Sequence, residues 1–183
     1  MGWKVKTLDK ENFALACAEL EYQVQADRYP PDIILAVLEG GKYVADNVFR
    51  ELPHYETRLQ RTGTAAKKGW KRELVRRLPR FFQDRLRIIE ASMLSRRHDS
   101  RGAADVSLPF GAEMDGRRIL IVDDAVDSGR TLRLVCEAVS RICPSSDIRS
   151  AVITVTTDSP ETDPDYALYR DRTLVRFPWS MDS

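Results

Sequence analysis

The sequence predicts a single α/β domain built on a mainly parallel sheet. Two stretches, residues 32–49 and 118–142, each run from a short apolar strand through a glycine-containing loop into a helix. The strand segments are apolar at nearly every position, which is typical of strands buried on both faces of a parallel sheet. With 183 residues, of which 43% are hydrophobic and 31% charged, the chain can bury one proper core. We therefore expect one domain over residues 1–183.

The first 30 residues predict a strand followed by a helix. Residues 3–8 are strand-like, and Asp9 is a plausible N-cap for a helix that reaches about residue 28. Pro30 and Pro31 then end this helix. Its buried face is predicted from apolar residues at helical spacing: Phe13, Cys17, Leu20 and Val24.

The first strand–loop–helix unit follows directly. Residues 32–38 predict a buried strand, Glu39-Gly40-Gly41-Lys42 a tight loop, and the residues from Val44 a helix. A glycine loop in this position brings backbone N–H groups to the carboxyl edge of a parallel sheet. Such an edge is where α/β proteins commonly bind ligands.

Residues 55–105 form a basic helical segment and loop. We predict a helix over 67–78, a short helical turn from Pro79, a strand over 86–94 and then a polar loop. A basic patch could bind RNA or an acidic partner. Interspersed acids favour the other interpretation, an amphipathic element with a solvated basic face. Residues 106–116 predict loop and turn.

The second unit carries most of the polar chemistry. Residues 119–122 predict a buried strand that ends at Asp123 and Asp124, and a loop of small residues leads into a helix from Leu132. The loop N–H groups and the positive end of the helix dipole then meet at one point, as phosphate sites require. Carboxylates beside that point can accept hydrogen bonds from sugar hydroxyls or hold a divalent cation. After this helix, residues 148–155 alternate into a further strand.

This second unit closely resembles the 5-phosphoribosyl-1-diphosphate (PRPP) motif of the type I phosphoribosyltransferases. Four apolar residues, two acids, two small or apolar residues, an acid, a hydroxyl residue, Gly, any residue and Thr follow one another in residues 119–131. The resemblance extends over residues 31–179 and is closest to hypoxanthine, guanine and xanthine enzymes. It implies a twisted, mainly parallel sheet with helices on both faces and a small hood, expected within residues 156–183.

The resemblance implies displacement of pyrophosphate from PRPP by a nucleobase nitrogen, and a purine-like base is expected. Asp127 would be catalytic, as the group that accepts the base proton, and Mg²⁺ would be held through Asp124. The residues expected to bind PRPP are Asp123, Asp124, Ser128, Gly129, Arg130, Thr131, Gly40 and Gly41.

Several positions depart from the family pattern. Glu39 replaces a basic residue in the diphosphate loop, so that Mg²⁺ or Lys42 must compensate its charge. Ser92-Met93 stands where a Ser-Tyr pair is expected, residues 156–158 lack an expected Lys, and Leu174 replaces an aromatic. These departures leave open a second hypothesis, a catalytically weak or inactive regulator that binds PRPP or a nucleotide. An RNA-binding regulator is a third, which rests on the basic segment alone.

Composition adds broader expectations. The net charge of +1 gives no general argument for nucleic acid or membrane binding, and the sequence has no apolar run of transmembrane length. The first residues lack the apolar core of a signal peptide, and the three cysteines show no metal-ligand spacing. We therefore expect a cytoplasmic protein. The resemblance suggests a homodimer, with residues 70–82 as part of its interface.

Overall fold

A six-stranded sheet forms the centre of the computed structural model, which describes residues 4–61, 104–170 and 173–180. Its strand order is β4-β3-β2-β5-β6-β7. Only the β3–β4 pair is antiparallel among these strands, so the predicted mainly parallel sheet is confirmed. The strands are β2 (Ile33–Val37), β3 (His54–Arg61), β4 (Ala104–Ser107), β5 (Arg118–Val126), β6 (Asp147–Val155) and β7 (Tyr166–Tyr169).

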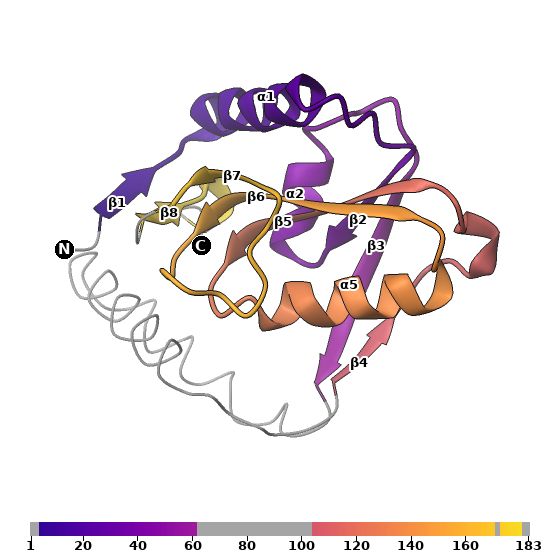
Figure 1. Cartoon of the computed structure of the whole chain (residues 1–183). Coiled ribbons are helices and arrows are strands. Elements are labelled where there is room, and N and C mark those ends of the chain that lie inside the picture. The colour runs from indigo at the N-terminus through magenta and orange to yellow at the C-terminus, as the bar shows by residue number, and fades with distance from the viewer. Residues whose placement is uncertain (1–3, 62–103, 171–172, 181–183) are drawn as a thin grey trace.

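Helices cover both faces of this sheet, as expected. Helix α1 (Lys10–Ala26) lies on one face and α5 (Arg130–Ile142) on the other, with α2 (Gly40–Ala45) beside β2 and β5 (Figure 1). Successive residues of β2 alternate between two cores because side chains of a strand point to opposite faces. Ile34 and Ala36 pack with α1, while Leu35 and Val37 pack with α5.

A two-stranded parallel sheet joins the two ends of the chain. Strand β1 (Lys4–Thr7) pairs with β8 (Thr173–Arg176), and the short 3-10 helix η3 (Pro178–Ser180) follows. The hood expected within residues 156–183 therefore shares its sheet with the N-terminal strand. Strand β7, from the same range, pairs instead with β6 in the large sheet.

Several predicted elements are found and three are corrected. The helix predicted from Val44 instead begins at Gly40 and ends at Ala45, so the predicted glycine loop, Glu39 to Lys42, forms the N-cap and first turn of α2. Asp9 caps α1 as predicted, since its side chain accepts a hydrogen bond of 2.8 Å from the Asn12 N–H. Strand β5, however, does not end at Asp123: it continues to Val126 because β6 pairs with it as far as Val155. The predicted loop over 106–116 begins inside β4 and contains the 3-10 helix η2 (Ala112–Met114). The helix predicted over 67–78 and the strand predicted over 86–94 lie outside the described residues.

Within the described ranges, no helix is both long enough and apolar enough to span a membrane.

An ion pair at the amino ends of β2 and β5 gives a pH-dependent prediction. Asp32 accepts hydrogen bonds from the Arg118 guanidinium at 2.7 Å and from the Arg118 N–H at 2.8 Å, and these bonds lower the pKa of Asp32 to about 2. A carboxyl group whose pKa is lower in the folded state than in the unfolded state stabilises the fold. This stabilisation is complete above the pKa of the unfolded state, roughly 4. This contribution is lost as the pH falls through 2. Asp32→Asn should thus lower the free energy of unfolding by about 1 kcal/mol at pH 7, and by about half as much at pH 3.

Urea unfolding of both proteins at pH 7, 5 and 3 measures this difference. Glu51→Gln, at an exposed position of the same charge type, serves as the control and should differ from the parent equally at each pH. A loss of stability for Asp32→Asn that does not shrink towards pH 3 would show that the charge of Asp32 is not responsible.

Candidate functional site

Two loops predicted from the sequence meet at the carboxyl edge of β2 and β5. These strands are parallel neighbours, so the glycine loop after β2 lies against the acidic end of β5. A Cβ atom added to Gly40 would lie 2.1 Å from Cγ of Asp124, and one added to Gly41 would lie 2.5 Å from the Val122 carbonyl oxygen. The backbone atoms around Gly41 leave no room for a Cβ atom, whereas a Cβ atom at Gly40 would require the Asp124 side chain to move. The structure therefore brings Gly40 and Gly41 together with the acid pair.

The acid pair Asp123–Asp124 is half-buried, and the pKa of both carboxyl groups is raised. Burial, and next the negative charge of Asp124, raise the pKa of Asp123 well above its ordinary value. Burial also raises the pKa of Asp124. The Asp124 N–H donates a hydrogen bond of 2.8 Å to Asp123. A ligand that brings a cation or hydroxyl donors to this edge would favour the ionised pair.

The loop after β5 has the form of a phosphate site. Gly129 has a φ of +77° and is the N-cap of the 13-residue helix α5, where it offers no side chain. The Ser128 hydroxyl accepts a long hydrogen bond of 3.4 Å from the Arg130 N–H, the first N–H of the helix. The segment after β6 closes against this loop: the Glu161 N–H donates to the Ser128 carbonyl oxygen at 2.7 Å. Arg130 and Thr131 form the first turn of α5, so the predicted phosphate-binding residues 128–131 lie on one loop at a helix N-terminus.

Asp127 is held by a contact that the sequence analysis did not foresee. Its Oδ1 atom accepts a hydrogen bond of 2.7 Å from the Thr156 hydroxyl. Thr156 is only 5% exposed, and its N–H donates to the Val126 carbonyl oxygen at 2.9 Å. Asp127 itself is exposed. The carboxylate is thus oriented by one oxygen, and the other oxygen, Oδ2, points to no hydrogen-bond donor among the described residues.

The charges around the diphosphate loop differ from the expectation. Lys42 pairs with Glu56 on β3, which raises the pKa of Lys42, and it does not pair with Glu39. Instead Nη2 of Arg58, also on β3, lies 3.7 Å from Oε1 of Glu39. Of the two groups expected to compensate Glu39, Lys42 therefore pairs with Glu56 instead, and compensation by Mg²⁺ stays a prediction.

The comparison with known families agrees with this geometry. The model of the phosphoribosyl transferase domain matches residues 5–182. The chain belongs to this family. No match was found among curated proteins.

Solved structures show the same phosphoribosyl transferase fold. A purine phosphoribosyltransferase from Pyrococcus horikoshii Ot3 is 19% identical, with a TM-score of 0.65, and the match covers 96% of this chain and 93% of that one. The xanthine-guanine-hypoxanthine phosphoribosyltransferase of Helicobacter pylori is also 19% identical, with a TM-score of 0.65 and coverage of 97% and 95%. A hypothetical protein from Neisseria gonorrhoeae with bound ppGpp is 13% identical, with a TM-score of 0.63 and coverage of 98% and 90%.

Two aromatic residues near the C-terminus of this phosphoribosyl transferase domain are used for packing. Trp179 stacks on Tyr43 at 4.2 Å and on Phe177 at 4.7 Å between ring centroids. Tyr166 is buried, and its hydroxyl donates to Asp27 at 2.9 Å. Both rings are therefore occupied within the protein, which leaves neither available to stack on a base.

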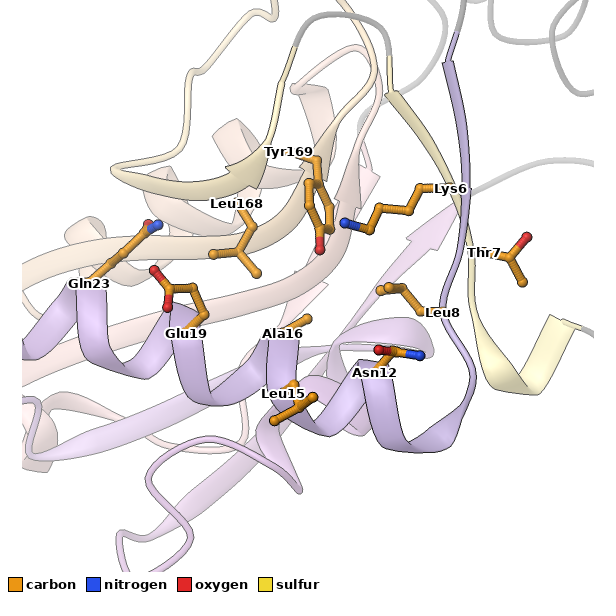
Figure 2. Close-up of a pocket in the computed structure, with 10 residues that line it drawn as sticks. All are labelled: Lys6, Thr7, Leu8, Asn12, Leu15, Ala16, Glu19, Gln23, Leu168 and Tyr169. Atoms are coloured by element: carbon orange, nitrogen blue, oxygen red, sulfur yellow. The ribbon is translucent and has the colours of Figure 1, made fainter.

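A hollow of about 480 Å³ lies away from the acid cluster, between α1, β1 and β7. Lys6 reaches over the Tyr169 ring at its rim, with 4.2 Å between Nζ and the ring centroid (Figure 2). None of the predicted site residues lines this hollow. It is thus separate from the site predicted from the sequence.

Metal binding would need oxygen atoms from a ligand. In the ranges that the structure describes, no three His, Cys, Asp or Glu side chains are grouped to hold an ion. The acid pair offers one or two carboxylates, which is the usual protein share of a Mg²⁺ site that is completed by phosphates and water. The predicted loop residues Ser92-Met93 and the predicted interface over 70–82 lie outside the described residues.

Proposed function

We propose that this protein transfers the 5-phosphoribosyl group from PRPP to a nucleobase nitrogen and releases pyrophosphate. The observation that carries the proposal is one sheet edge that combines an acid pair, a glycine loop packed on Asp124 and a phosphate-type loop at the start of α5. A ligand with vicinal hydroxyls between two phosphate groups matches this arrangement. Family membership supports the same reaction class.

Each part of PRPP has candidate partners on this edge. Asp123 and Asp124 accept hydrogen bonds from the ribose hydroxyls, and residues 128–131 bind the 5′-phosphate. Gly40 and Gly41 let the backbone approach the diphosphate. Asp124 would hold Mg²⁺, which would supply positive charge beside the diphosphate and the acid pair.

Asp127 accepts the proton that leaves the acceptor nitrogen. The Thr156 hydroxyl donates to Oδ1, and in this proposal Oδ2 is the oxygen that takes the proton. A positioned carboxylate contributes to catalysis by general base action, and the hydrogen bonds around PRPP fix the geometry of the cation-like sugar. We propose a purine-like acceptor because the solved structures of similar fold include several purine phosphoribosyltransferases. The cytoplasmic location and the homodimer stay predictions.

A second candidate is a PRPP- or nucleotide-binding regulator without turnover. Glu39 in the diphosphate loop and Thr156 at the end of β6 favour it, since neither supplies the positive charge that the resemblance leads us to expect. The similar fold from Neisseria gonorrhoeae was solved with ppGpp. The RNA-binding hypothesis concerns a segment that lies mostly outside the described residues.

One experiment separates these functions. The protein is incubated with PRPP, Mg²⁺ and each of adenine, hypoxanthine, guanine, xanthine, uracil and orotate, while pyrophosphate release is followed. We expect saturable release with at least one purine and none without a base. Saturable PRPP binding without release from any base would favour the regulator. RNA binding that weakens steeply with salt, without PRPP binding, would favour the third hypothesis.

A further inference from the structure

The diphosphate end of the site carries an excess of negative charge. Glu39 lies at the start of the glycine loop, and the next residue, Gly40, packs directly on Asp124. Asp123 adds a third carboxylate to the same sheet edge. A diphosphate that binds here meets like charges, which is unfavourable unless a cation offsets them. Mg²⁺ could neutralise the acid pair, whereas the Glu39 side chain is 79% exposed and has Arg58 as its ion-pair partner among the described residues.

Among the described residues, strand β3 supplies the cation that pairs with Glu39. The parallel register of β2 and β3 pairs Val37 with Thr57, so Arg58 lies beside the residue that leads into the loop. Residues 56 and 58 point to the same face of β3 because side chains alternate along a strand. Glu56 holds Lys42, and Arg58 reaches Glu39. Lys42 is therefore paired with Glu56, and Arg58 is the basic residue that contacts Glu39 in the loop.

We propose that Arg58 binds the diphosphate of PRPP and exchanges the carboxylate of Glu39 for phosphate oxygens when the substrate arrives. The exchange is easy, because the side chains of Arg58 and Glu39 are 63% and 79% exposed and such exposed pairs are weak. A guanidinium binds phosphate through two parallel N–H bonds, which are stronger than its loose contact with Glu39. This inference rests on the proposed function and assigns a residue outside the family's loop to the diphosphate.

A double-mutant cycle tests the assignment. Binding of Mg²⁺–pyrophosphate and Mg²⁺–PRPP is measured by titration calorimetry for the parent, Arg58→Ala, Glu39→Gln and the double variant. Arg58→Ala should lower the affinity for both ligands about tenfold, which is the usual effect of losing a charge-assisted hydrogen-bond pair. Glu39→Gln should raise the affinity for both ligands several-fold. In the Glu39→Gln background, Arg58→Ala should still weaken binding about tenfold.

Two controls accompany the cycle. Arg58→Lys keeps the charge and should retain part of the affinity, which separates ligand binding from a folding defect. Arg50→Ala removes another exposed arginine, whose Nε donates to the Asp46 carbonyl oxygen at 3.0 Å, and it should leave affinity unchanged. Thermal unfolding confirms that every variant is folded.

The possible outcomes are distinct. If the loss caused by Arg58→Ala disappears in the Glu39→Gln background, Arg58 only neutralises Glu39 and the assignment is wrong. Unchanged affinity of Arg58→Ala overturns the assignment as well, while the proposed function stands. A parent protein that binds neither pyrophosphate nor PRPP overturns both.

Discussion

Asp127→Asn should lower kcat by about 10²- to 10⁴-fold, with PRPP affinity nearly unchanged. The amide has the same shape as the carboxylate and can still accept the hydrogen bond from the Thr156 hydroxyl, so the loop keeps its conformation. The amide cannot, however, accept a proton from the acceptor base. Steady-state pyrophosphate release gives kcat, and titration calorimetry gives the PRPP affinity. The effect should therefore fall on the chemical step and spare binding.

The control for this substitution lies in the segment between β6 and β7. Asp163→Asn removes an acid that pairs with Arg170 at 2.6 Å, in the same segment that closes on the phosphate loop. It should leave kcat unchanged. A normal kcat for Asp127→Asn would show that Asp127 is not the proton acceptor. A fall in PRPP affinity as large as the fall in kcat would assign Asp127 to substrate binding instead.

The sequence alone could predict elements and motifs because their signals are local. The apolar run at residues 119–122, the acids after it and the helical spacing from Leu132 are consecutive in the chain. The positions of α1, β2, β5, β6 and α5 follow from such patterns to within a few residues. The meeting of Gly40 with Asp124 does not, because it depends on β2 and β5 being neighbours across 80 or so intervening residues.

Long-range side-chain contacts could not be predicted in the same way. The Thr156–Asp127 bond joins the residues that directly follow β6 and β5, and the Arg58–Glu39 pair joins β3 to the N-cap of α2, so each depends on the register of the strands. A one-residue change of register would send Arg58 to the other face of the sheet. The extension of β5 to Val126 has a similar origin, because its partner β6 continues to pair past the acids. These contacts determine the charge and orientation of the site, whereas the local motif determines only its location.

Gly129→Ala should reduce both stability and PRPP affinity, because two separate effects act at this position. The φ of +77° is unfavourable for alanine by roughly 1–2 kcal/mol. The new Cβ would also lie 2.7 Å from the Thr162 N atom and 2.8 Å from its carbonyl oxygen, which are backbone atoms that cannot turn away. We expect the free energy of unfolding to fall by about 3 kcal/mol and PRPP affinity by about tenfold or more.

Gly116→Ala isolates the conformational part of this effect. Gly116 has the same φ of +77°, but a Cβ atom there meets nothing within 4 Å. Its substitution should lower stability by only about 1 kcal/mol and leave PRPP affinity unchanged. Urea unfolding and titration calorimetry of both variants measure the difference. Equal stability losses would show that the segment at residues 161–162 does not press on Gly129, and unchanged PRPP affinity of Gly129→Ala would separate this loop from the phosphate. A larger loss at Gly129 in both measurements would mean that the close packing of the 161–162 segment holds the loop in the shape that binds phosphate.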